Sequence, residues 1–345
     1  MGRSRMAVPF ILVFFIACLF TLQAYWPVEE GIEVEVPTKE EPTEAPEEPR
    51  SLTLEKVDNY PLYVLRLEGD YGFSEFLRTG VLNFSFGGPG PSCACFSASG
   101  NGSDPLFGRN FDFPSNPALL LFTDPPDGYA SVSMVDLGYF GYSMGRLPEP
   151  DGDLEVLKMT PYLPFDGMNE HGLAVGMAAI PSAEPPYDSG RVTIGEIQVI
   201  RLLLDKSRGV EEAISLLGEY NVEMTDPPIH YMLADRAGSS AIVEFIGGEM
   251  KVLQGGEPWQ VMTNFIVHGS GAPRIVSCSR YVSAYDGLRG ANGSVVMAEA
   301  MGLLEVSSQT STIWSCVYNL ETGDILIAMG RKYNDALSFQ LPLAQ

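Results

Sequence analysis

An acidic, proline-rich stretch near the N-terminus most limits what this chain can fold into. Residues 29–48 contain nine glutamates and one lysine, and four prolines lie in or directly after them. Such a segment buries too little apolar surface to fold, and its like charges repel one another. We therefore expect an extended linker over residues 28–51. A packed core must come from the residues that follow, which are numerous enough for one sizeable domain.

An apolar segment precedes this linker. Arg3 and Arg5 stand before the uncharged, mostly apolar run Met6–Trp26. Because this run is longer than the roughly 7–15 apolar residues of a signal peptide, it favours a membrane anchor over residues 1–27, with a cleaved signal as the alternative. Basic residues before the run and acidic residues after it place the rest of the chain outside. We expect a membrane-anchored protein with an extracytoplasmic domain, or a secreted one if the segment is cleaved.

The composition argues against several classes of function. A formal net charge of −23, without any cluster of lysine and arginine, argues against nucleic acid as a partner. The chain has only three histidines, and they lack metal-ligand spacing. The pair Cys93 and Cys95 has no second pair to complete a zinc site, and it is not a Cys-x-x-Cys redox motif. We therefore expect no metal and no cofactor. The sequence does not decide whether Cys278 and Cys316 form a disulfide.

From residue 52 onward the pattern alternates between the periods typical of strands and helices. The expected strand regions are 60–71, 93–99, 105–113, 129–143, 167–180, three short strands within 229–254, a fourth over 259–267, and a hairpin over 311–330. The expected helices are 193–207, 209–221, 278–290 and 294–307, and residues 72–81 are expected to form a short helix or a turn. Strands, then helices, then strands, helices and a closing hairpin indicate an α+β fold with antiparallel sheets.

Residues 91–113, "PSCACFSASGNGSDPLFGRNFDF", contain the strongest chemical signal. A cysteine nucleophile needs a base, and histidine is scarce in this chain. A cut before Cys93 would free an α-amino group, whose reference pKa of about 7.7–8.0 suits a general base at neutral pH. The loop "FGGPGPS" at 86–92 cannot form regular structure and runs straight into this cysteine, so it is a place where such a cut could happen.

Five motifs in order carry a resemblance to a known family. They are "CACF…GRNFDF", "GMNEHGLAVG" (167–176), "HYMLADRAGSSAIVEF" (230–245), "VMTNF" (261–265) and "SCSRY" (277–281). The chain resembles the N-terminal-nucleophile hydrolases of the choloylglycine hydrolase, penicillin V acylase and acid ceramidase group, the linear-amide C–N hydrolases. The resemblance implies a four-layer α-β-β-α sandwich. It also implies a pro-segment or small subunit over 52–92 and a catalytic domain over 93–345.

The resemblance assigns roles residue by residue. Cys93 would be the nucleophile with its own α-amine as base, and Arg109 would lie beside its thiolate. Asp112 would hold the amine, Asn264 would donate to the oxyanion, and Arg280 would complete a charge network. The 16 residues from Cys93 to Arg109 match the family's hairpin span.

Other positions receive structural roles. Cys95 is expected to be a buried neighbour on the strand face of Cys93. Asn169 and Glu170 are expected in a turn, and His230 and Asp235 as structural members of the strand meander.

The sequence departs from the bile-salt hydrolases in two respects. Ala179 stands ten residues after Asn169, where those enzymes place a second oxyanion asparagine, which argues against conjugated bile salts. The long segment before Cys93 looks more like the ceramidase and acyltransferase branches.

The resemblance implies a small-molecule N-acyl amide substrate with an apolar acyl group. Candidate pocket residues, for which core packing is an equal explanation, are Phe113, Leu119–Leu121, Phe122, Tyr139 and Phe140. Two alternatives stay open, an acyltransferase that uses an amine as acceptor and a non-catalytic binding domain on a stalk. Assembly into a homo-oligomer also stays open.

Overall fold

The computed structural model describes residues 52–80, 92–149, 152–270 and 277–345. Contacts divide the chain into residues 1–45 and 46–345, and everything described belongs to the second unit. The expected anchor (1–27) and linker (28–51) lie outside the described residues. Within the described ranges, we find no helix with the length and apolar character needed to span a bilayer.

Two large sheets form the centre of this unit. In spatial order, the nine-stranded sheet contains β1 (Leu52–Lys56), β2 (Leu62–Glu68), β5 (Ala118–Asp124), β6 (Ser131–Asp136), β7 (Asp166–Asn169), β8 (Ala174–Ala179), β11 (Ile229–Ala234), β12 (Ser240–Ile246) and β13 (Glu249–Gln254). The six-stranded sheet contains β14 (Trp259–Met262), β3 (Ser92–Ala98), β4 (Leu106–Asp112), β15 (Thr312–Asn319), β16 (Asp324–Met329) and β17 (Leu337–Gln340). A short parallel pair joins β9 (Thr193–Gly195) to β10 (Asn221–Glu223).

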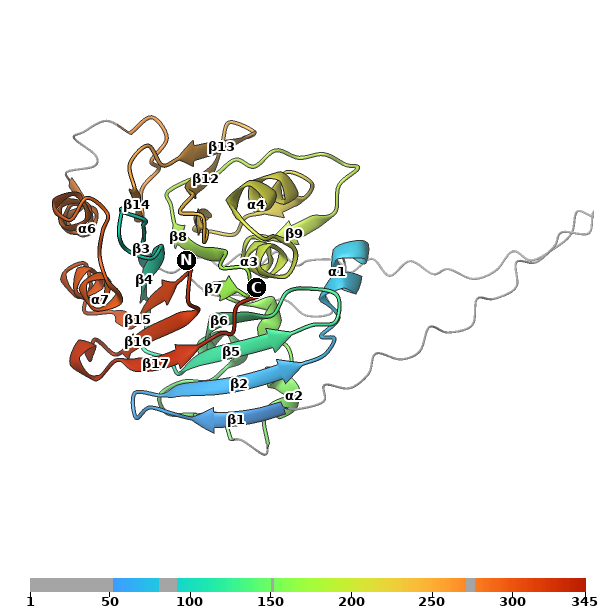
Figure 1. The fold of residues 1–345 in the computed structure, drawn as a ribbon. Coiled ribbons are helices and arrows are strands. Elements are labelled where there is room, and N and C mark those ends of the chain that lie inside the picture. The colour runs from blue at the N-terminus through green and yellow to red at the C-terminus, as the bar shows by residue number, and fades with distance from the viewer. Residues whose placement is uncertain (1–51, 81–91, 150–151, 271–276) are drawn as a thin grey trace, which may run out of the picture. The chain divides into compact units, whose positions relative to one another are not determined.

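Helices cover the outer face of each sheet (Figure 1). The helices α3 (Glu196–Lys206) and α4 (Val210–Leu217) pack on the nine-stranded sheet, and α6 (Ser279–Gly290) and α7 (Met297–Val306) pack on the six-stranded sheet. The expected four-layer α-β-β-α sandwich is therefore confirmed. The shorter helical segments are α1 (Phe73–Thr79), α2 (Leu154–Leu157), η1 (Leu137–Phe140), η2 (Thr160–Tyr162) and η3 (Tyr333–Asp335).

The strand expected over 259–267 differs from the structure in length and in partner. It ends at Met262, and β14 pairs with β3 of the six-stranded sheet rather than continuing the meander β11–β13. Alternation along a strand shows which side chains are buried but not which strand lies beside it. The chain leaves the sheet after Met262, so Asn264 follows the end of a strand that lies directly beside the one carrying Cys93.

The hairpin of β3 and β4 is confirmed, and its register places the reactive groups. Cys93 pairs with Phe111, and Cys95 pairs with Arg109. Paired residues of an antiparallel ladder share a face, and alternate residues along a strand do too. These four side chains therefore point to the core between the sheets. Asp112, the next residue after Phe111, belongs to the opposite face, towards α6 and α7.

Residues 52–80 are an integral part of the nine-stranded sheet. Strand β2 lies between β1 and β5, and its pairing with β5 is parallel. Leu62, Leu65 and Leu67 of β2 are buried. Farther on, the Tyr71 hydroxyl donates to the Asp205 carboxylate of α3 at 2.5 Å. This segment thus shares core and hydrogen bonds with the residues that follow position 92.

Gly176 of β8 allows the two sheets to approach beside the hairpin. A Cβ at this position would lie 2.8 Å from Phe107 Cζ and 3.3 Å from Cys95 Sγ. We expect Gly176→Ala to lower the free energy of unfolding by about 1–3 kcal/mol because the packed neighbours must move. Denaturant unfolding measures this, with Gly256→Ala as control, since a Cβ there meets nothing within 4 Å. Equal stabilities of the two variants would contradict the close approach.

Candidate active site

Cys93 lies near the start of β3 and is completely buried. The Arg109 side chain donates from Nη2 to the Cys93 sulfur at 3.0 Å and to the Met177 carbonyl at 3.1 Å. Met177 belongs to β8, so the guanidinium spans the two sheets at the position of the thiol.

Asp166 of β7 holds the other side of the same guanidinium. Its carboxylate accepts from Arg109 Nη1, from Trp314 Nε1 at 3.1 Å and from the Tyr318 hydroxyl. All four side chains are fully buried. Sequence reasoning missed Asp166, which directly precedes the "GMNEHGLAVG" motif; its place beside that motif is the signal that could have found it.

Burial controls the charge of the thiol in the uncut chain. It raises the pKa of Cys93 above that of an ordinary thiol, and the positive charges of Arg109 and Arg280 offset only part of this effect. Burial alone would lower the pKa of Arg109, but the neighbouring Cys93 and Asp166 raise it above its ordinary value. Arg109 is therefore a cation, yet it does not by itself hold Cys93 as a thiolate at neutral pH.

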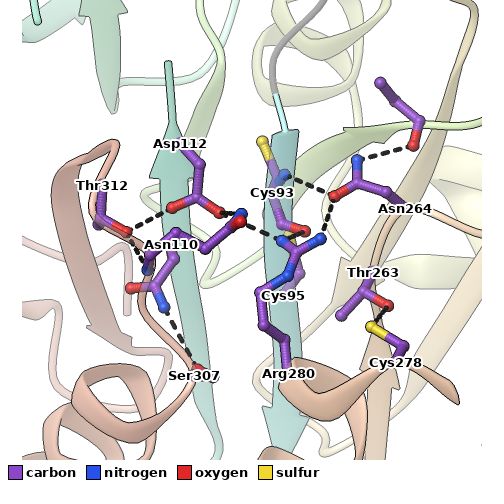
Figure 2. Close-up of polar contacts among 12 residues, drawn as sticks. Cys93, Cys95, Asn110, Asp112, Thr263, Asn264, Cys278, Arg280, Ser307 and Thr312 are labelled. Atoms are coloured by element: carbon purple, nitrogen blue, oxygen red, sulfur yellow. Dashed lines mark hydrogen bonds and ion pairs between the residues drawn. The ribbon is translucent and has the colours of Figure 1, made fainter. Parts of the chain in front are cut away.

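A second network, on the helix-facing side, holds the backbone of Cys93 (Figure 2). Arg280 of α6 donates from Nη1 to the Cys93 carbonyl at 2.9 Å and to Asp112 Oδ2 at 3.1 Å. Its Nη2 donates to Asn264 Oδ1 at 2.8 Å. Asp112 also accepts hydrogen bonds from two residues that sequence reasoning missed, Gln309 and Thr312.

Asn264 contacts both Cys93 and the nine-stranded sheet. Its Oδ1 accepts from the Cys93 backbone N–H at 3.0 Å, and its Nδ2 donates to the Ala179 carbonyl at 2.7 Å. The structure thus brings all five predicted site residues together. In this uncut chain the Cys93 backbone N–H donates to Asn264. The sequence had led us to expect that Asp112 would hold this nitrogen once it is a free amine. The Asn264 amide, which we expected to donate to the oxyanion, donates here to Ala179. This is the position at which bile-salt hydrolases have their second oxyanion asparagine.

The other cysteines within the described ranges are free thiols. Cys95 is buried, as expected, with its sulfur 4.0 Å from the Met177 carbonyl. Cys316 belongs to the core between the sheets, while Cys278 packs on the helix side of the six-stranded sheet, so the two do not form the bridge that the sequence left open. Across the described residues, we find no group of three or more acidic, histidine or cysteine side chains that could hold a metal.

The turn and meander residues take the structural positions expected of them. Asn169 Oδ1 accepts from the backbone N–H groups of His171 and Leu173, so this side chain closes the turn between β7 and β8. Asp235 accepts from the first N–H of α4, that of Val210, at 2.9 Å.

The candidate pocket residues separate into two groups. Leu119, Leu121 and Phe140 pack in the cluster on the far face of β5, and Leu120 lies fully buried in the main core. Phe122 is also buried in the main core, and the Arg66 guanidinium lies over its ring. These five side chains pack the fold.

Phe113 and Tyr139 form the second group. Their rings stack with centroids 6.0 Å apart. Burial raises the pKa of the Tyr139 hydroxyl, and the nearby charges of Asp136 and Cys93 raise it further. The Phe113 ring centroid also lies 5.7 Å from that of Phe111, which pairs with Cys93 in the β3–β4 ladder, so both aromatic residues stay candidates for the acyl pocket.

The Asp166 carboxylate should be essential to the packing behind Cys93. We expect Asp166→Asn to lower the free energy of unfolding by about 3–5 kcal/mol, because it leaves the buried Arg109 cation without its counter-charge. Urea unfolding of the intact chain measures the effect. Glu75→Gln is the matched control, since the Glu75–Arg78 pair is exposed and contributes at most about 1 kcal/mol. A loss no larger than in the control would contradict this role.

Comparison with known proteins agrees with the geometry. The model of the family described as "Linear amide C-N hydrolases, choloylglycine hydrolase family" matches residues 93–270. A penicillin V acylase from Agrobacterium tumefaciens is similar in structure, with 19% identity, a TM-score of 0.53, and coverage of 72% of this chain and 86% of the other. A mutant of a conjugated bile acid hydrolase from Clostridium perfringens is also similar in structure, with 16% identity and a TM-score of 0.52. The match covers 72% of this chain and 92% of the other.

The two structural matches, at these identities, establish a shared fold, and no curated protein sequence matches the chain. The family match covers just over half of the 345 residues. The chain therefore belongs to the choloylglycine hydrolase family and is a hydrolase of linear amide C–N bonds.

Proposed function

We propose that the protein cuts its own chain between Ser92 and Cys93 and then hydrolyses an N-acyl amide through a thioester on Cys93. One observation carries this proposal. Separate side chains hold three parts of Cys93: Arg109 contacts the sulfur, Asn264 the nitrogen and Arg280 the carbonyl oxygen. A merely structural cysteine needs none of these contacts.

The first reaction is an acyl shift within the chain. The Cys93 sulfur attacks the Ser92 carbonyl carbon, and a C–S bond forms as the C–N bond to Cys93 breaks. The thiol proton ends on the nitrogen that leaves. Water then hydrolyses the thioester, which gives the Ser92 carboxylate and a free thiol. The product carries an α-amine on the nucleophile's own residue.

The second reaction uses that amine as the base. It takes the thiol proton, and the sulfur attacks the carbonyl of the substrate amide. The leaving amine receives the proton, and the acyl group stays on sulfur as a thioester. The same α-amine then takes a proton from water as the water oxygen attacks the thioester carbonyl. The C–S bond breaks, the proton passes from the amine to the sulfur, and the acid is released. Because burial keeps the Cys93 thiol protonated, a base this close is what the chemistry requires.

The surrounding groups have distinct roles in these steps. Arg109 stabilises negative charge on sulfur, and it is itself held by Asp166. Asn264 is the proposed oxyanion donor. Its side-chain NH2 group has two hydrogens, so donation to the substrate oxygen does not require loss of the contact with the Ala179 carbonyl. Arg280 and Asp112 form an ion pair that fixes the Cys93 backbone.

Replacement of the nucleophile tests this proposal. In the full chain we expect a new N-terminus at Cys93 and hydrolysis of N-acyl amides, both abolished in Cys93→Ala. Mass spectrometry of the termini and a panel of amides with different acyl groups measure these outcomes. Added amines that capture the acyl group would instead indicate the acyltransferase alternative.

Cys95→Ala is the matched control for the nucleophile. It removes a buried thiol two residues away and should leave the cut and the hydrolysis in place. An intact wild-type chain with an unreactive Cys93 would refute the proposal, and a terminus at Cys95 would move the nucleophile by two residues.

We further propose that the segment before the cut stays bound as a small subunit. Strands β1 and β2 belong to the nine-stranded sheet, so after cleavage they should elute with residues 93–345 in size-exclusion chromatography without denaturant. Leu65→Glu, which places a charge in the core, should release the segment, whereas the exposed Glu55→Gln should not. Separation of the wild-type pieces with the larger one still folded would contradict this assignment.

A further inference from the structure

A buried histidine–glutamate pair connects the nine-stranded sheet to the segment that carries Asn264. His230 lies on β11 and Glu244 on β12, and both side chains are completely buried. The ring Nδ1 of His230 is 2.9 Å from Glu244 Oε1, and its Nε2 is 2.9 Å from the Thr263 carbonyl oxygen. Thr263 directly precedes Asn264.

Glu244 holds the other end of the same segment. Its Oε1 accepts from the Val267 backbone N–H at 2.7 Å, and its Oε2 accepts from the His268 backbone N–H at 2.8 Å. The pair therefore fixes residues 263–268 at both ends. This segment leaves β14 of the six-stranded sheet, so its position depends on groups that belong to the opposite sheet.

Hydrogen-bond chemistry determines where the protons lie. Burial alone would raise the pKa of the Glu244 carboxyl, but hydrogen bonds from His230 and two backbone N–H groups lower it below its usual value. Glu244 is thus an ionised acceptor, and the Thr263 carbonyl is also only an acceptor. Both ring nitrogens of His230 face acceptors, and each contact is favourable only if that nitrogen bears a hydrogen.

We infer that His230 donates from both ring nitrogens and that the charged His230–Glu244 pair positions Asn264 against Cys93. A buried ion pair gives little net stability compared with apolar packing, so its effect lies in placement. Asn264 contacts the Cys93 nitrogen, Arg280 and Ala179, and a shift of about 1 Å in such a group can cost 10²-fold in rate. His230 and Glu244 are positioning residues, and their effect on rate rests on the proposed function.

The first experiment reads the protons directly and needs no catalysis. The full chain with Cys93→Ala is labelled with ¹⁵N in its three histidines, and His171→Gln and His268→Gln assign the other two signals. At pH 7.5 we expect both ring nitrogens of His230 to carry a proton. A bare nitrogen on His230 would overturn the inference.

The same Cys93→Ala protein, labelled with ¹⁵N in its asparagine side chains, reports on Asn264. The side-chain amide signals of Asn264 are assigned by their loss in Asn264→Ala. They should shift in His230→Gln, which removes the positive charge of the His230 ring and one of its two hydrogen-bond donors. His268→Gln is the matched control, because its exposed side chain lies outside the pair while its backbone N–H remains. Unmoved Asn264 signals in His230→Gln would overturn the positioning role, whether or not the chain cuts itself.

The second experiment is a double-mutant cycle on the rate of cleavage before Cys93. We expect His230→Gln to slow this step about 10–100-fold in the wild-type background but less than about 3-fold when Asn264→Ala is already present. Equal slowing in both backgrounds would contradict action through Asn264. Glu244→Gln, which keeps the side-chain volume, replaces His230→Gln in the cycle if the latter does not fold. If the wild-type chain does not cut itself, the proposed function fails while the spectroscopic results still decide this inference.

Discussion

The contact of the buried Arg109 guanidinium with Asp166 on one side and the Cys93 sulfur on the other is the interaction on which the site depends. A cation removed from water is tolerated only with a counter-charge and satisfied hydrogen bonds. Asp166 provides the charge from one sheet, and Arg109 comes from the other. The requirement to pair this charge therefore sets the relative position of the sheets where the thiol lies.

Cys93 itself divides its contacts between the two faces of a strand. Its sulfur faces the core between the sheets, while its carbonyl accepts from Arg280 of α6 on the helix side. Its backbone N–H donates to Asn264, which also contacts Ala179 of the opposite sheet. This separation keeps the Arg109–Asp166 pair apart from the Arg280–Asp112 pair. Both pairs nevertheless act on the same residue, because the charges of Asp112 and Arg280 also affect the pKa of the Cys93 thiol.

The sequence predicted the local parts of this arrangement well. The hairpin that carries Cys93 and Arg109 follows from alternation and a glycine turn, and the motifs located Asp112, Asn264 and Arg280. Contacts between distant segments could not be read, because alternation specifies a face and not a partner strand. For that reason the place of β14, the Asp166 carboxylate and the Glu244 contacts came only from the structure. The membrane anchor stays a prediction.

The parallel pairing of β2 with β5 has a further consequence for the mature protein. With the proposed cut, one sheet is built from two polypeptides, so the information for folding no longer resides in a single chain. Refolding becomes a bimolecular reaction whose rate depends on concentration, because after the cut no covalent bond keeps the two pieces together. A molecule that assembles as one chain and works as two would lose activity irreversibly on heating, and its lifetime would be set by the rate of unfolding.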